Sequence, residues 1–288
     1  MTAAASSAPQ AGPPPRGRSL RKLVNRAVWY VAAVILALFI AFPIYLIFIS
    51  AMSTREAIFA YPKTLIPSEV TLDNIEFFIN AGGVIDAFWR SVIVGIITVI
   101  LALGIGAPAG YAIARYAFRG RNSYRLVVLA TRAFPIVILS IPMALTFRFI
   151  GISDSVWAVA IAHTALALPF AILITSSVFV SIPRELEEAA QTLGCSPWRA
   201  FLRIALPLAL PGLTAAAIFT WVLSWNDVFA AAILTLRNPT LPAHILMGLT
   251  ASPLFFQFAA GFILIVPSLI VIFVIRKYLL GLWGRVVK

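Results

Sequence analysis

Three ionisable side chains, Arg132, His163 and Asp227, fall inside stretches of sequence that are otherwise apolar. In a bilayer such groups are costly unless they pair or face water, so they indicate either a solute path or a tie between helices. Asp227 directly follows Asn226. An amide and a carboxylate beside aromatic rings suit a sugar, which stacks on rings and donates hydroxyl hydrogen bonds. The candidate residues of a substrate path are Trp221, Trp225, Asn226, Asp227, Arg132, Phe134, His163 and Thr164.

The same side chains also suit hydrogen bonds between neighbouring helices. For Asp227 both interpretations remain open. For His163, which stands next to Thr164, a helix–helix hydrogen bond is the favoured one. Arg132 either lines the route or pairs across a subunit boundary, and Phe134 is equally suited to a lipid-facing or packing role.

The sequence contains no motif for catalysis or metal binding. It lacks a G-x-x-x-x-G-K-[ST] phosphate loop, an HExxH pair, a CxxC pair and a G-x-S-x-G nucleophile elbow. We therefore expect no catalytic residue, no metal site and no cofactor in this chain. A membrane-embedded enzyme would need several catalytic residues at the same depth in the membrane. Two histidines and Asp227 are few residues for such a site.

The elements that position these residues are predicted to be membrane helices. Of the 288 residues, 61% are hydrophobic and 11% charged, whereas soluble domains carry about a quarter charged residues. Six apolar stretches reach the length of about 20 residues that a helix needs to cross a bilayer. The predicted fold is an all-α membrane protein with a six-helix domain over residues 28–275. Its spans are predicted at 28–50, 91–114, 126–147, 156–180, 208–234 and 256–275.

The net charge of +12 follows the expected topology and does not indicate nucleic-acid binding. Basic residues cluster in the N-terminal tail, after the second span, in the segment 181–207 and at the C-terminus. Basic segments stay on the cytoplasmic side, so both termini and the segment 181–207 are predicted to be cytoplasmic. We expect residues 1–27 to form a disordered basic tail, residues 51–90 an outward loop and residues 276–288 a cytoplasmic tail.

The segment 181–207, called loop 181–207 below, has a helix–glycine–helix pattern. Glutamates follow Pro183 near the positive end of a helix dipole. Gly194 is placed to end that helix in a left-handed conformation. Ser196 and Pro197 suit the cap and first position of a second helix. We predict two short amphipathic helices that protrude from the membrane and present a surface to which another molecule can bind.

Loop 181–207 resembles that of permease subunits of bacterial ATP-binding-cassette (ABC) importers. Its matching residues are Glu188-Ala189-Ala190, Gly194 three residues later, and Ile204, Leu206 and Pro207 after nine more. Further matching stretches are 110–121, 130–135, 182–186 and 225–229, and the chain departs from the pattern at Arg90-Ser91. It is most similar to the smaller six-span permease of maltose- or glycerol-phosphate-type sugar importers.

This resemblance implies the remaining parts of an importer. They are a second homologous permease, a homodimer of cytoplasmic ATPase subunits that bind ATP and Mg²⁺, and an extracytoplasmic solute-binding protein. The matching loop residues would couple the chain to the ATPase, and the chain would reside in the bacterial inner membrane. An ABC permease for a non-sugar solute is the main alternative. A secondary transporter would need inverted repeats and ion-binding carboxylates at the midplane, and Asp227 is the only intramembrane acid we expect.

Overall fold

The computed structural model describes residues 20–283 except 63–64, 68 and 250–251. The chain forms two units, one ending at Phe48 and one beginning at Ile49. The described part of the first unit consists of residues 20–48 of the helix α1 (Leu20–Ala51), whose last three residues belong to the second unit. It begins eight residues before the predicted span, because residues 20–27 are mostly good helix formers that extend the apolar segment. The expected disorder of residues 1–19 lies outside the described residues.

The second unit is helical throughout its described part, and no strand occurs there. Short helices α2 (Arg55–Phe59) and α3 (Asp73–Ile79) precede the long helix α4 (Val84–Arg115). The next helices are α5 (Arg121–Ala130), a 3-10 turn (Thr131–Ala133), α6 (Ile136–Phe149) and α7 (Val156–Val180). Then come α8 (Glu185–Thr192), α9 (Pro197–Ala200), a π-helical segment (Phe201–Ala205), α10 (Leu206–Asn226), α11 (Phe229–Leu234), α12 (Leu241–Leu249) and α13 (Leu254–Trp283).

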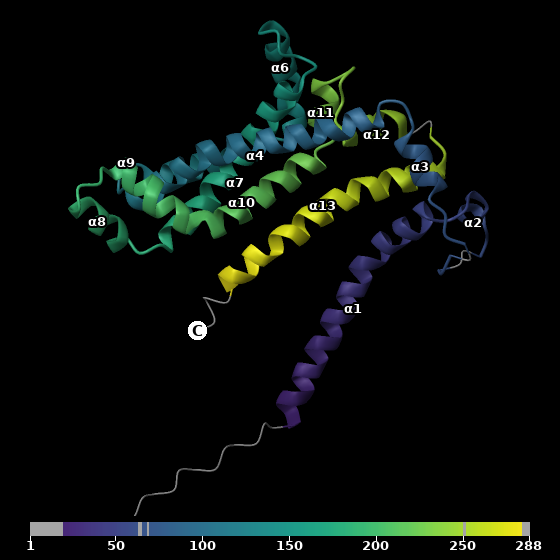
Figure 1. The fold of residues 1–288 in the computed structure, drawn as a ribbon, viewed down its shortest axis with the longest axis horizontal. Helices are drawn as coiled ribbons and strands as arrows, with labels where there is room; N and C mark the ends of the chain where they lie inside the picture. Colours follow the sequence, from purple (N-terminus) through teal and green to yellow (C-terminus); the bar gives the residue numbers. More distant parts are fainter. Residues whose placement is uncertain (1–19, 63–64, 68, 250–251, 284–288) are drawn as a thin grey trace, which may run out of the picture. The chain divides into compact units, whose positions relative to one another are not determined.

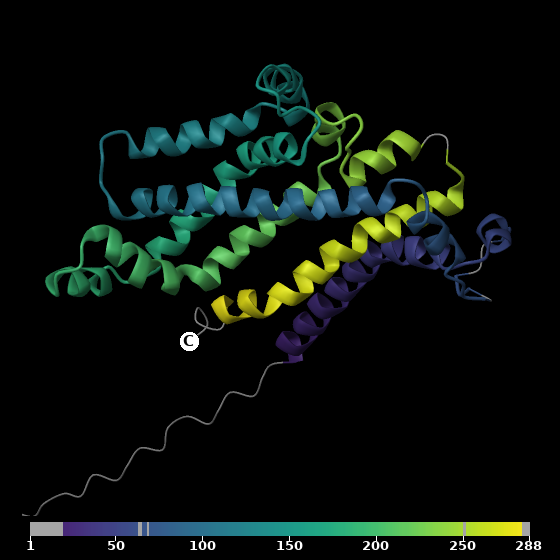
Figure 2. The ribbon, with the colours of Figure 1, turned by 45° about the horizontal axis from the view of Figure 1, so that its top comes forward.

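The centre of this unit is the pair α4 and α7, with α10 packed against both and α13 packed against α10 (Figures 1 and 2). Two glycines of α4 let the pair approach closely. A Cβ added to Gly110 would lie 2.1 Å from the Thr175 hydroxyl, and one added to Gly106 would lie 2.9 Å from Cβ of Ala171. Thr175 also donates a hydrogen bond to the Gly106 carbonyl at 2.9 Å. Small residues at a membrane helix interface allow this kind of packing.

Five helical stretches of the described chain are long and apolar enough to cross a membrane, and a bent pair supplies a sixth. The pair consists of residues 121–133 and 136–149 and bends by 88°. The prediction of one continuous helix over 126–147 is therefore wrong. The cause is Pro135, which disfavours the helical conformation of the preceding residue, so Phe134 is extended at φ −87° and ψ 119°.

Further predicted boundaries also differ from the structure. The second span was predicted to begin at residue 91, but α4 begins at Val84, inside the predicted outward loop 51–90, which also contains α2 and α3. The fifth span was predicted to continue to residue 234, but α10 ends at Asn226 and α11 begins as a separate helix at Phe229. The last span was predicted to end at residue 275, whereas α13 continues to Trp283, so residues 276–283 are helical. Residues 284–288 of the predicted C-terminal tail lie outside the described residues.

Candidate functional site

The first half of loop 181–207 has the local structure that its residues predict. Gly194 ends the segment that follows α8 with φ +90°, where a side chain would be strained. Its N–H donates to the Gln191 carbonyl at 2.9 Å, and the N–H of Cys195 donates to the Ala190 carbonyl at 3.0 Å. These bonds occupy carbonyls that the end of a helix leaves free. The Ser196 hydroxyl then accepts from the N–H of Arg199 and caps α9.

The second half of the loop differs from the prediction of two separate short helices. The helix that begins at Pro197 runs on without a break through the π-helical segment into α10, so residues 197–226 form one helical stretch. In the π-helical segment the N–H of Leu206 donates to the carbonyl of Phe201, five residues earlier. Leu206 and Pro207 follow directly on the π-helical segment inside this continuous stretch, and Pro207 has no N–H to donate to a carbonyl of the preceding turn.

One side of α8 is exposed, although it carries apolar residues. Leu193 is 87% exposed, and Leu186 and Ala189 are exposed as well. Glu188 is exposed and pairs with Arg184 one turn earlier at 3.1 Å. Ala190, Ile204 and Leu206 are half-buried, and Gly194 and Pro207 are exposed. Exposed leucines beside a capped turn form a surface that can bind another protein.

The structure adds a residue that sequence reasoning missed. Glu187 is 3% exposed and binds Arg115 at the end of α4, with Nη2 2.6 Å and Nε 2.8 Å from one carboxylate oxygen. The Tyr111 hydroxyl donates to the other oxygen. A signal was present in the sequence, because Tyr111 and Arg115 are four residues apart and therefore share one face of a helix.

Two of the candidate path residues form a buried cluster at the junction of α7, α10 and α11. His163 Nε2 lies 3.1 Å from Asp227, and His163 Nδ1 lies 2.9 Å from the Ser224 hydroxyl. Since a carboxylate only accepts, Nε2 carries a proton, and in the neutral ring the Ser224 hydroxyl donates to Nδ1. The Asp227 carboxylate also accepts from the N–H of Ala231 at 3.0 Å in the first turns of α11. This bond satisfies one of the N–H groups that the start of α11 leaves free.

Three more candidates are also in contact with the chain's own helices. Trp225 is buried, its Nε1–H donates to the Leu264 carbonyl of α13 at 3.0 Å, and its ring stacks on Trp221 at 5.7 Å. The Trp221 ring lies against Gly95, where an added Cβ would be 2.8 Å away. Thr164 donates to the Ala160 carbonyl within its own helix. By contrast, the neighbouring Asn226 is exposed.

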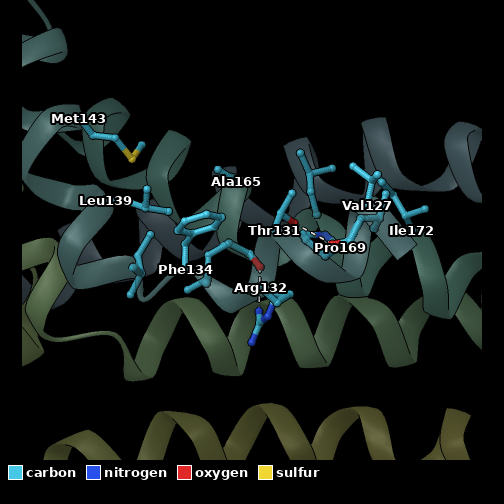
Figure 3. Close-up of a pocket in the computed structure, with 13 residues that line it drawn as sticks. Val127, Thr131, Arg132, Phe134, Leu139, Met143, Ala165, Pro169 and Ile172 are labelled. Atoms are coloured by element: carbon cyan, nitrogen blue, oxygen red, sulfur yellow. Dashed lines mark hydrogen bonds between the residues drawn. The ribbon is translucent and has the colours of Figure 1, made fainter. Parts of the chain in front are cut away.

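Arg132 and Phe134 lie at the bend between α5 and α6, beside a cavity of about 370 Å³ (Figure 3). The cavity is apolar except for Thr131 and Arg132. Arg132 donates to the Leu166 carbonyl of α7 at 3.0 Å, and its guanidinium lies 3.9 Å from the centre of the Phe170 ring. In the described chain no hydrogen bond joins Arg132 to the Asp227 cluster. The structure therefore separates the candidates into a mostly buried group, with Trp221 half-buried, and a second set in which Phe134 and Asn226 are exposed and Arg132 is half-buried.

Comparison with known sequences identifies a family match. Residues 102–280 match the family model described as "Binding-protein-dependent transport system inner membrane component". The trehalose transport system permease protein SugB of Mycobacterium tuberculosis is 35% identical over 78% of this chain and 84% of its own length. The diacetylchitobiose uptake system permease protein DasC of Streptomyces coelicolor is 27% identical over 93% of this chain and 99% of its own.

Solved structures show the same fold. A chain of a bacterial ABC transporter involved in the import of the acidic polysaccharide alginate superposes with a TM-score of 0.73 at 22% identity. That match covers 92% of this chain and 99% of the other. A chain of the MetNI methionine ABC transporter in an inward-facing conformation superposes with a TM-score of 0.56 at 22% identity, covering 68% of this chain and 95% of its own.

Proposed function

This chain belongs to the family of inner-membrane components of binding-protein-dependent transport systems, and we propose that it is a membrane-spanning subunit of an ATP-driven sugar importer. It is a multi-pass membrane protein of a transporter permease family, and we propose that it has no catalytic role of its own. The relatives named for trehalose and diacetylchitobiose support a sugar as the solute. We propose that a solute-binding protein delivers this sugar outside the membrane and that a second, homologous permease completes the path.

Energy enters this importer from partner subunits. The sequence has no phosphate-binding loop, so ATP and Mg²⁺ would be bound by a pair of ATPase subunits. The observation that carries the proposal is the exposed surface of α8, with Leu186, Glu188 and Leu193 beside the turn at Gly194. This protruding surface with exposed apolar side chains would fit a cleft on the ATPase. Movement of the ATPase would then shift whole helices of this chain, because packed interfaces convert small shifts into movements of whole helices.

The proposed function is tested by purifying the chain with the neighbouring permease and ATPase and reconstituting it with its binding protein. Radiolabelled trehalose and diacetylchitobiose are suitable first substrates. Uptake that requires ATP inside the vesicle and the binding protein outside supports an importer. Uptake driven by an ion gradient without ATPase would instead indicate a secondary transporter. If only non-sugar solutes stabilise the binding protein in a thermal-shift screen, the result would contradict a sugar substrate. It would favour an ABC permease for another class of solute.

The first prediction concerns orientation. With Cys195 replaced by serine, a cysteine at Arg121 is expected to be protected from an impermeant thiol reagent in intact cells, because basic segments stay in the cytoplasm. A cysteine at Arg237, in the exposed turn before α12, is expected to react. Permeabilised cells serve as the control in which both sites react. Reaction at position 121 in unbroken cells would reverse the proposed orientation.

The second prediction concerns the binding of the ATPase. Glu188→Lys reverses a charge on the exposed surface of α8. Gly194→Leu adds a side chain at φ +90°, which costs about 1–3 kcal/mol in backbone strain. Both variants are expected to insert normally but to retain less ATPase during copurification. Gly151→Leu is the matched control, since Gly151 also has positive φ and open space around it but lies outside the loop. Equal ATPase retention in all three variants would contradict the role of loop 181–207.

A further inference from the structure

Two neighbouring glutamates of α8 have opposite surroundings. Glu188 has a side chain that is 60% exposed, and its partner Arg184 is on the same short helix. Glu187 is 3% exposed, and its partners lie 72 and 76 residues earlier in the chain. A surface ion pair contributes little, whereas a buried carboxylate must be fully bonded to be tolerated. Glu187 is therefore the acid that attaches α8 to the body of the protein.

Both oxygens of the Glu187 carboxylate are bound to the last two turns of α4. Arg115 binds one oxygen through Nε and Nη2, and the Tyr111 hydroxyl donates to the other. The same Nη2 also donates to the Ile182 carbonyl at 3.0 Å, in the turn between α7 and α8. Arg115 is 8% exposed, so these bonds are largely shielded from water. Charge-assisted bonds in such surroundings have a fixed geometry and are stronger than neutral ones.

The end of α4 is in turn packed firmly against its neighbours. The Tyr111 ring contacts Phe179 of α7 and Phe201 of the π-helical segment, at 5.3 and 4.6 Å between ring centres. One residue earlier, Gly110 brings the α4 backbone against Thr175 of α7. The C-terminal ends of α4 and α7 are thus closely packed and are expected to move together. A force on α8 that reached Glu187 would therefore act on both helix ends.

Few other contacts could replace this attachment. The apolar side chains Leu186 and Leu193 of α8 are exposed and do not anchor it to the spans. Its other packed neighbours, α9 and the π-helical segment, run on without a break into α10, so the bonds of Glu187 are what joins α8 directly to α4. We propose that Glu187 is the positioning residue that transmits movement of loop 181–207 into α4, through Arg115 and Tyr111. This role rests on the coupling function proposed above and assigns its transmission to specific side chains.

The test measures whether nucleotide binding reaches the far end of α4. In the reconstituted complex with other cysteines removed, Ile85→Cys at the start of α4 is labelled by an impermeant maleimide. The labelling rate is compared with and without Mg²⁺ and a non-hydrolysable ATP analogue, so no transported solute is needed. We expect Glu187→Gln to reduce the nucleotide-dependent change in rate at least about fivefold, the lower end of typical coupling between sites. Glu185→Gln, on the exposed side of the same helix, is expected to behave as the parent.

A second variant separates transmission from folding. Glu187→Leu combined with Arg115→Met and Tyr111→Phe replaces the buried cluster by apolar side chains of similar size and leaves no Tyr111 hydroxyl without its acceptor, which often preserves stability. We expect this triple variant to assemble with parental yield and melting temperature and still to lose the nucleotide response. A full response in a stable triple variant would overturn the role of Glu187 and leave the cluster as packing only. If the labelling rate at position 85 does not change with nucleotide in the parental complex, although the ATPase is bound, the coupling function would be overturned as well.

Discussion

Gly110→Ala is expected to destabilise the protein by on the order of 3 kcal/mol, the upper end of the usual cost of overpacking. The added Cβ would lie 2.1 Å from the Thr175 hydroxyl, 2.7 Å from the backbone nitrogen of Ser176 and 2.9 Å from the Ile172 carbonyl. Two of these three atoms belong to the α7 backbone, so no change of rotamer can relieve the contact. The helices α4 and α7 must move apart. The yield and melting temperature of the purified complex measure the effect.

The matched control for this prediction is Gly104→Ala, six residues earlier in the same helix. A Cβ at Gly104 meets nothing within 4 Å, and alanine favours a helix over glycine by about 1 kcal/mol. This variant is expected to be as stable as the parent or slightly more stable. Equal stability of the two variants would show that α4 and α7 are not held in the close packing described here.

Asp227→Ala is expected to lower the yield and melting temperature of the complex before it affects transport. The change leaves His163 Nε2 and the N–H of Ala231 without their acceptor. Loss of hydrogen bonds to a charged group costs about 1.5–3 kcal/mol, and here it also loosens the junction of α7, α10 and α11. Transport per assembled complex is expected to remain near the parental rate, measured on the same preparation.

The neighbouring Asn226 provides the contrast for Asp227. It is exposed, so Asn226→Ala is expected to leave stability unchanged and to reduce uptake if its amide faces the solute. An Asp227→Ala complex with parental melting temperature but little uptake would place Asp227 in the substrate path instead. The two variants together separate a structural tie from a solute contact.

Local chemistry made part of this structure predictable from sequence. The turn of loop 181–207 depends on Gly194 and the Ser196 cap, which act within a few residues, and both were found as expected. The bend at Pro135 was less predictable, because the hydropathy of a segment indicates how long and how apolar it is. It does not indicate the angle between the two helices that the segment forms. The partner of Asp227 was not predictable either, because it is a histidine 64 residues away.

The surroundings of Glu187 were likewise not predictable from sequence. Glu187 and Glu188 are identical in type and adjacent in sequence, and both fit the start of a helix. Only the fold decides that one of them faces Arg115 and Tyr111 and the other faces solvent. Pairing between distant segments is a tertiary property, and a single sequence carries no direct record of it.

The π-helical segment Phe201–Ala205 fixes the angular phase between α9 and α10. A π-helical turn holds one more residue than an α-helical turn. Because that turn takes up the additional residue, deleting one residue there would restore α-helical winding and leave the direction of α9 nearly unchanged, whereas deleting one residue from the α-helical part of the stretch would rotate α9 by about 100° about the axis of α10. In the second case Trp198 and Arg199 would face a different direction without any change in their own chemistry. The fit of loop 181–207 to the proposed ATPase therefore depends on the direction of α9 as well as on its surface residues, and a single-residue insertion or deletion in the α-helical part is expected to weaken that fit.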